Sequence, residues 1–197
     1  MDNANETLKA YNSIYLEIIM RYRDYIEERE GLYLADLPKL VTPEEENVLF
    51  LAKQMQSSFP VYSYEENFLE MAKLSYNYIK EKIIQISLPL QFWLRPAQTI
   101  KYGAGDLFDK AVLLCSLLIA SGNSSAKVIV MANNRDRKFI VFFEFQNKVV
   151  GIDIEKGIKE YNSVSEIFEG LDIDKIGEDD EDTTVYEFND RIYRDIV

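Results

Sequence analysis

Residues 107–121 constrain this chain more than any other segment, because they predict a helix with apolar side chains on almost every side. The apolar members are Leu107, Phe108, Ala111, Val112, Leu113, Leu114, Leu117, Leu118 and Ile119. Asp106 and Asp109 stand three residues apart at its start, a spacing typical of a capping box, and Gly122 ends it. A helix that is apolar all round is buried, so we expect it at the centre of the domain.

The hydrophobic pattern changes to that of β-strands after this helix. Residues 127–132, 138–145 and 148–154 are rich in Val, Ile and Phe, which favour strands. Residues 133–134 and 146–147 are typical of hairpin turns, so the segment predicts an antiparallel meander. Two sets of apolar residues alternate along the middle strand: Phe139, Val141, Phe143 and Phe145 on one face, Ile140 and Phe142 on the other. Both faces of the sheet therefore need cover.

The first 84 residues predict three helices. The first carries an apolar stripe at spacings of three and four residues: Leu8, Tyr11, Tyr15, Ile18, Tyr22 and Tyr25, widened by Ile14, Ile19 and Ile26. The second is expected to begin at Thr42 and Pro43, and the third at Ser63. Because both sheet faces need cover, we expect the stripe of the first helix to be buried against the domain. A helix that binds a partner is the alternative.

Together these elements predict an α+β fold in which a central buried helix packs on an antiparallel sheet. We assign residues 1–62 to a helical N-terminal region packed on the core, 63–175 to the core, and 176–197 to an acidic loop and a C-terminal segment. The acidic loop, residues 177–182, offers no apolar side chain to a core, so we expect it to be solvated and mobile. Residues 183–188 have the composition of one more strand.

Composition and charge exclude several classes of function. The 197 residues carry a net charge of −12, which repels phosphate backbones, so we expect no nucleic-acid partner. The chain has no His, the commonest general base, and one Cys, so it forms no internal disulfide. It begins without the pattern of a signal peptide, and its longest apolar run is shorter than the about 20 residues that span a bilayer. We therefore expect a cytoplasmic protein that does not bind membranes.

Three stretches of the chain carry motifs with a characteristic spacing. They are Trp93-Leu94-Arg95-Pro96-Ala97-Gln98-Thr99-Ile100, Gly103-Ala104-Gly105-Asp106-Leu107-Phe108-Asp109-Lys110-Ala111 and Leu113-Leu114-Cys115-Ser116-Leu117-Leu118. They resemble the transglutaminase-like superfamily, which has a papain-like cysteine protease fold. In that family an aromatic-x-x-Pro-x-x-Thr segment leads into a Gly-x-Gly-Asp-Cys-x-Asp signature at the start of a helix. Strands that carry a His and an acidic residue follow. The resemblance covers residues 63–154 and implies the same fold.

Two of the three catalytic positions that the resemblance implies hold aliphatic residues. The nucleophilic Cys of the family corresponds to Leu107, its His to Ile140 and its acidic residue to Asp153. Leu and Ile can neither attack a carbonyl nor transfer a proton, so we expect no enzyme activity. A shift of the alignment by one residue does not place a His at the catalytic position, because the chain has no His. If the resemblance holds, Leu107 and Ile140 are in van der Waals contact and Asp153 lies close by.

The remaining reactive side chains favour structural roles. Cys115 lies eight residues into the predicted central helix, so we expect a buried and inert thiol. Four carboxylates could together bind a hard cation or serve a carboxylate-based hydrolase: Asp106, Asp109, Glu144 and Asp153. Helix capping explains the first two directly, so we expect no metal and no cofactor.

The resemblance thus implies a catalytically inactive transglutaminase-like domain that serves as a binding or scaffolding module for a protein or peptide. The side chains expected to line its cleft are Trp93, Asp106, Phe108 and Phe142. A structural subunit that forms a homo-oligomer through the Tyr-rich first helix is the alternative. A further alternative is a resemblance to the inactive transglutaminase-like domains of DNA-damage recognition factors. The chain's charge of −12 and its lack of a basic cluster argue against their function.

Overall fold

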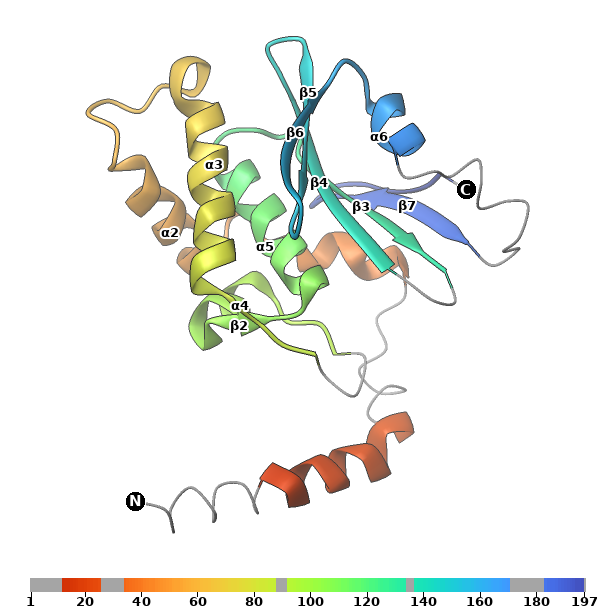
Figure 1. Ribbon diagram of the computed structural model, residues 1–197. Coiled ribbons are helices and arrows are strands. Elements are labelled where there is room, and N and C mark those ends of the chain that lie inside the picture. The colour runs from red at the N-terminus through yellow and green to blue at the C-terminus, as the bar shows by residue number, and fades with distance from the viewer. Residues whose placement is uncertain (1–11, 26–33, 88–91, 134–136, 171–182, 197) are drawn as a thin grey trace.

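A six-stranded antiparallel sheet carries most of the C-terminal half of the chain (Figure 1). The structure is a computed structural model, and it describes residues 12–25, 34–87, 92–133, 137–170 and 183–196. The strands lie in the order β6-β5-β4-β3-β7-β8. They are β3 Lys127–Ala132, β4 Arg137–Phe145, β5 Lys148–Asp153, β6 Gly157–Tyr161, β7 Thr184–Phe188 and β8 Tyr193–Asp195. The three strands of the predicted meander are confirmed. Gln146 and Asn147 have φ angles of 49° and 63°, as the tight turn between β4 and β5 requires.

Apart from a helix over residues 12–25, the other described elements are helices and a short pair of parallel strands. They are η1 Leu34–Leu40, α2 Glu46–Gln56, α3 Tyr64–Lys82, β1 Ile84–Gln85, α4 Pro96–Tyr102, β2 Ala104–Gly105, α5 Leu107–Ala120 and α6 Val164–Gly170. The start of α3 after Ser63 is confirmed, whereas α2 begins later than expected, because Thr42 and Pro43 form a turn before it. No helix among the described residues is long and apolar enough to cross a bilayer.

The helix α5 lies between the sheet and the helices α2 and α3 (Figure 1). Its residues 108–118 are all buried, as the apolar composition predicts. The capping box is also confirmed, because the Asp106 carboxylate accepts the N–H of Asp109 at 2.8 Å and Asp109 accepts that of Asp106 at 3.0 Å. Gly122 follows the helix with a φ of 111°, a conformation that favours glycine.

Successive side chains of β4 point to opposite faces of the sheet, and the hydrophobic core forms two clusters, one on each face. Val141 and Phe143 belong to a large cluster that also contains the buried side chains of α2, α3 and α5. Within it, the ring of Phe68 from α3 meets Phe143 edge-on at a centroid distance of 5.1 Å. Ile140 and Phe142 belong to a small cluster on the opposite face, where α6 contributes Ile167. The expected division of β4 into two apolar faces is therefore correct.

Residues 12–25 form a helix, called here the N-terminal helix, whose apolar stripe is exposed. Tyr15, Ile18, Tyr22 and Tyr25 are between 48% and 60% exposed, so the prediction that this stripe is buried against the domain is wrong. Other elements form the two clusters, and of the described residues before 63 it is those from η1 onward, including Val41, Phe59 and Tyr62, that pack on the core. The stripe residues Leu8, Tyr11 and Ile26 lie outside the described residues.

The C-terminal segment contributes β7 and β8 to the sheet. β7 pairs with β3 on one side and β8 on the other, so the core extends beyond residue 175. Residues 183–188 were expected to form a strand, whereas β6 and β8 were not predicted. The acidic loop at residues 177–182 lies outside the described residues.

A buried ion pair joins β7 to β3. The Glu187 side chain is 3% exposed, and its Oε1 accepts a hydrogen bond from the Nζ of Lys127 at 2.9 Å. Arg194 lies farther from the same oxygen, at 3.8 Å, and is mostly exposed. Because an unpaired buried carboxylate is costly, the position of β7 depends on Lys127.

We predict that Lys127→Met lowers the free energy of unfolding by about 2–4 kcal/mol, because it leaves the Glu187 charge buried without its closest partner. The matched control is Lys148→Met, which removes an ion pair to Glu160 whose two side chains are both more than half exposed. That change should cost less than about 1 kcal/mol. Urea denaturation of both variants measures the difference, and equal losses would contradict the argument.

Candidate functional site

The amino-terminal end of α5 is the candidate site, because the resemblance places the catalytic nucleophile there. Aromatic side chains from four separate segments meet at this end and form what we call the aromatic cluster: Trp93, Phe108, Phe139 and Phe188. The ring of Phe108 lies at its centre, with centroid distances of 5.1 Å to Trp93, 5.7 Å to Phe139 and 6.0 Å to Phe188. These distances are typical of packed aromatic pairs. Apolar packing therefore fills the end of α5 where the resemblance implies the nucleophile.

The strand residue that faces α5 is Phe139 rather than Ile140. Phe139 contacts Phe108 and packs against the large cluster. The half-buried Leu107 also packs against that cluster. Ile140 belongs to the small cluster on the other face of the sheet, so the predicted contact between Leu107 and Ile140 is wrong. Because successive side chains of a strand point to opposite faces, an alignment displaced by one residue produces this error.

Asp153 also lies on the face away from α5. It is paired with Ile140 in the register of β4 and β5, and paired residues of antiparallel strands share a face. Its Oδ1 accepts the N–H groups of Glu155 and Lys156 at 2.9 Å and 3.0 Å. Backbone donors thus satisfy the carboxylate, as expected, and Asp153 stabilises the turn between β5 and β6. It does not converge with Leu107.

Asp109 ties the segment before α4 to the start of α5. Its Oδ1 accepts the N–H of Leu94 at 2.8 Å and its Oδ2 accepts that of Asp106 at 3.0 Å. The residue is 1% exposed. Burial raises the pKa of its carboxyl to about 7, and the charge of Asp106 adds to the rise. Because Leu94 follows Trp93 directly, this clamp also fixes the backbone beside Trp93. A carboxyl so enclosed is poorly placed to act as a general acid on a substrate.

Of the four residues expected to line a cleft, the structure brings Trp93 and Phe108 together in the aromatic cluster. Asp106 lies at the same end of α5, where its side chain caps the helix. Phe142 was wrongly assigned to this group, because it belongs to the small cluster on the opposite face of the sheet. Phe139 and Phe188 were not predicted as partners of Phe108, although the alternation of side chains along β4 places Phe139 and Phe142 on opposite faces.

The thiol of Cys115 is remote from solvent. The residue is fully buried in the large cluster, and burial raises the pKa of the thiol above its ordinary value. The thiolate, which is the nucleophilic form, is therefore disfavoured.

The four carboxylates considered as a cation site do not lie together. Asp106 and Asp109 cap α5, Asp153 holds the β5–β6 turn, and Glu144 lies near the end of β4. Among the described residues no group of three or more Cys, Asp or Glu side chains is arranged to hold a metal ion.

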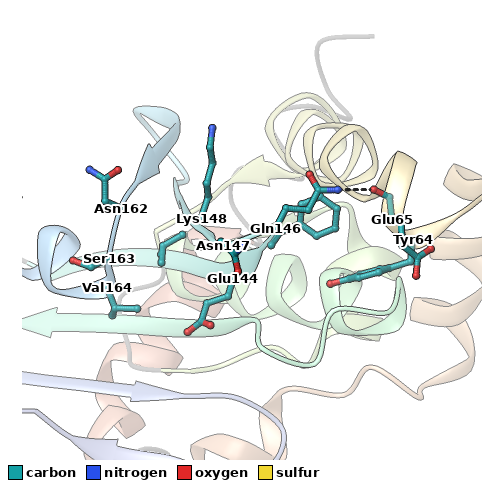
Figure 2. Close-up of a pocket in the computed structure, with 11 residues that line it drawn as sticks. Tyr64, Glu65, Glu144, Gln146, Asn147, Lys148, Asn162, Ser163 and Val164 are labelled. Atoms are coloured by element: carbon teal, nitrogen blue, oxygen red, sulfur yellow. Dashed lines mark hydrogen bonds between the residues drawn. The ribbon is translucent and has the colours of Figure 1, made fainter.

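Glu144 instead lines an open groove of about 680 Å³ over the turn between β4 and β5 (Figure 2). The groove runs from the start of α3 to the segment that follows β6, and its lining residues are Tyr64, Glu65, Glu144, Phe145, Gln146, Asn147, Lys148, Val149, Asn162, Ser163 and Val164. Beside the start of α3, Gln146 donates a hydrogen bond to the carbonyl oxygen of Glu65 at 2.9 Å. The groove shares no residue with the aromatic cluster, so it is separate from the candidate site.

The chain is an α+β protein whose central buried helix packs on an antiparallel sheet, which is consistent with a transglutaminase-like fold. The solved structure of Legionella pneumophila LapG, which has this fold, matches the chain with a TM-score of 0.50 and 13% sequence identity. The match covers 84% of this chain and 88% of LapG. At this identity the similarity shows the fold alone. No family model matches the sequence, and no curated protein does.

We predict that the carboxyl carbon of Asp109 titrates with a midpoint near 7 in NMR spectra, well above the ordinary value of 3.8. Because the folded protein then holds this proton more tightly than the unfolded chain, the group lowers the free energy of unfolding as pH rises from about 4 to about 7. Asp109→Asn should remove this pH dependence and cost about 1–3 kcal/mol, since its amide NH₂ cannot accept a backbone hydrogen bond. A midpoint near 4 would contradict the burial argument.

We further predict that Gly105→Ala destabilises the start of α5. A Cβ at Gly105 would lie 2.9 Å from the Cβ of Asp109 in α5 and 3.2 Å from the Cγ2 of Thr99 in α4. Both side chains would have to move away from residue 105. Overpacking of this kind costs about 1–3 kcal/mol. Gly170→Ala is the matched control, because nothing lies within 4 Å of the added Cβ. Thermal unfolding should show a lower midpoint for the first variant only.

Proposed function

We propose that this chain is a catalytically inactive transglutaminase-like domain that binds a protein or peptide at the amino-terminal end of α5. The observation that carries the proposal is the aromatic contact between Phe108 and Phe139, beside Leu107 at the family's nucleophile position. These side chains offer neither a nucleophile nor a general base, and the chain has no His that another conformation could bring in. What remains at this place is the capacity to bind apolar groups.

The apolar side chains at this end of α5 are only partly buried, which supports a binding role. Trp93, Leu107 and Phe139, which we call the apolar surface, pack against the large cluster and keep part of their area in solvent. Aromatic side chains that are anchored on a rigid core are typical of the energetically important positions of protein interfaces. An extended segment of a partner that presents a large apolar side chain has the matching chemistry.

We predict that iodoacetamide does not alkylate Cys115 in the folded protein, because its thiol is buried and its pKa is raised. The same reagent should label Cys115 fully once the protein is unfolded in denaturant, which is the internal control. Intact-protein mass spectrometry measures both states. Rapid labelling of the folded protein, together with thiol-dependent hydrolysis or transamidation that is lost in Cys115→Ser, would overturn the proposed inactivity.

Selection from a random peptide display library tests the binding role directly. We expect enriched peptides to carry a large apolar side chain and to lose affinity by about tenfold or more for Leu107→Lys, which places a charge within the apolar surface. Ile84→Lys is the control, because it adds the same charge at a side chain that is 70% exposed elsewhere. No enrichment, or equal losses for both variants, would contradict the proposal.

A further inference from the structure

The N-terminal helix carries more exposed large apolar side chains than any other described helix. Seven large apolar side chains within its fourteen residues are each about half exposed: Ile14, Tyr15, Leu16, Ile18, Met20, Tyr22 and Tyr25. None of them belongs to either hydrophobic cluster of the domain. Both faces of the sheet are already filled by other elements, so the rest of the described chain offers this helix no place in the core.

A helix with an apolar face needs packing in order to be stable. Isolated helices shorter than about 12–15 residues are marginal in water, and most of their stability in proteins comes from burial of an apolar face. Ile14, Ile18 and Ile19 also lower the intrinsic helix propensity, because they are β-branched. The exposed stripe therefore points to a surface that covers it in the assembled protein.

The stripe has the geometry of a self-pairing helix. Tyr15, Ile18, Tyr22 and Tyr25 follow one another at spacings of three, four and three residues, which is the a/d pattern of a helix seam. In the sequence, Leu8 and Tyr11 continue the same spacing. With Ile14 beside it, this seam presents on the order of 500 Å² of side-chain surface, since large rings bury about 150–250 Å² each. The standard interface buries about 800 Å² per partner. The area of the described part alone therefore approaches the area buried in the smallest stable dimers.

The charge of this segment argues against a membrane as the covering surface. Glu17 and Asp24 balance Arg21 and Arg23, and Arg21 is already paired with Glu17 at 3.1 Å. Helices that lie on anionic membranes carry an excess of Lys and Arg on their polar face. Here the helix has no net charge, and the whole chain at −12 is repelled by anionic lipid. A second copy also carries a charge of −12, but the two helices that would meet are themselves neutral.

We propose that the N-terminal helix pairs with the same helix of a second copy of this chain, so that Tyr15, Ile18, Tyr22 and Tyr25 form the seam of a homodimer. A two-fold interface of this kind is self-complementary, because the same stripe serves both partners. The proposal does not depend on the proposed function at α5, and either can fail without the other.

Sedimentation equilibrium of the full chain, from low to high micromolar concentrations, tests the proposal. We expect a reversible monomer–dimer equilibrium whose dissociation constant rises by about tenfold or more in Ile18→Glu, because a charge would enter an apolar seam. Met20→Glu is a closely matched control, since Met20 is 50% exposed against 48% for Ile18. Two residues turn a helix by about 200°, so Met20 lies on the side opposite the seam, and this variant should dimerise as the original chain does.

Three results would overturn the proposal. The first is a chain that stays monomeric at the highest concentration, whether or not it then binds lipid vesicles. The second is a dimer that Ile18→Glu leaves intact, and the third is equal dissociation of both variants. Thermal unfolding of each variant verifies that the domain remains folded, which is expected because both substitutions are at exposed positions.

Discussion

Burial of α5 is the constraint on which the rest of the structure depends. The helix is enclosed over residues 108–118, so α2, α3 and the sheet must each contribute an apolar face to cover it. Its start is fixed by the carboxylate of Asp109, which accepts backbone N–H groups from Asp106 and Leu94. Through that clamp, the segment that carries Trp93 is held where its ring meets Phe108.

The same geometry accounts for the proposed loss of catalysis. The resemblance implies a nucleophile at the start of the central helix and a base on the strand that meets it, because nucleophile and base act within hydrogen-bond reach. Here the two elements still meet, but they meet through Phe108 and Phe139, so the contact is one of ring against ring. This aromatic packing stabilises the domain, and its partly exposed edge is the surface that we propose for binding.

Much of this fold could be predicted from the sequence, because strong local patterns marked it. The apolar composition of residues 107–121 predicted a buried central helix, and alternation along β4 predicted two apolar faces. Which face meets α5 could not be predicted, since both are apolar, and this ambiguity misplaced Ile140. β6 was missed because its residues 158–160 are exposed at the sheet edge and give no apolar alternation. The stripe of the N-terminal helix misled for a different reason: a buried face and an interface between two chains require the same spacing.

The most direct test of the account is the set of proton contacts at the start of α5, measured as nuclear Overhauser effects in solution. The account predicts contacts between the rings of Phe108 and Phe139, whose centroids are 5.7 Å apart, and between Phe108 and Trp93, at 5.1 Å. Contacts between the methyl groups of Leu107 and Ile140, without those between the Phe108 and Phe139 rings, would contradict it. They would mean that the opposite face of β4 meets the helix and that aromatic packing does not fill the site.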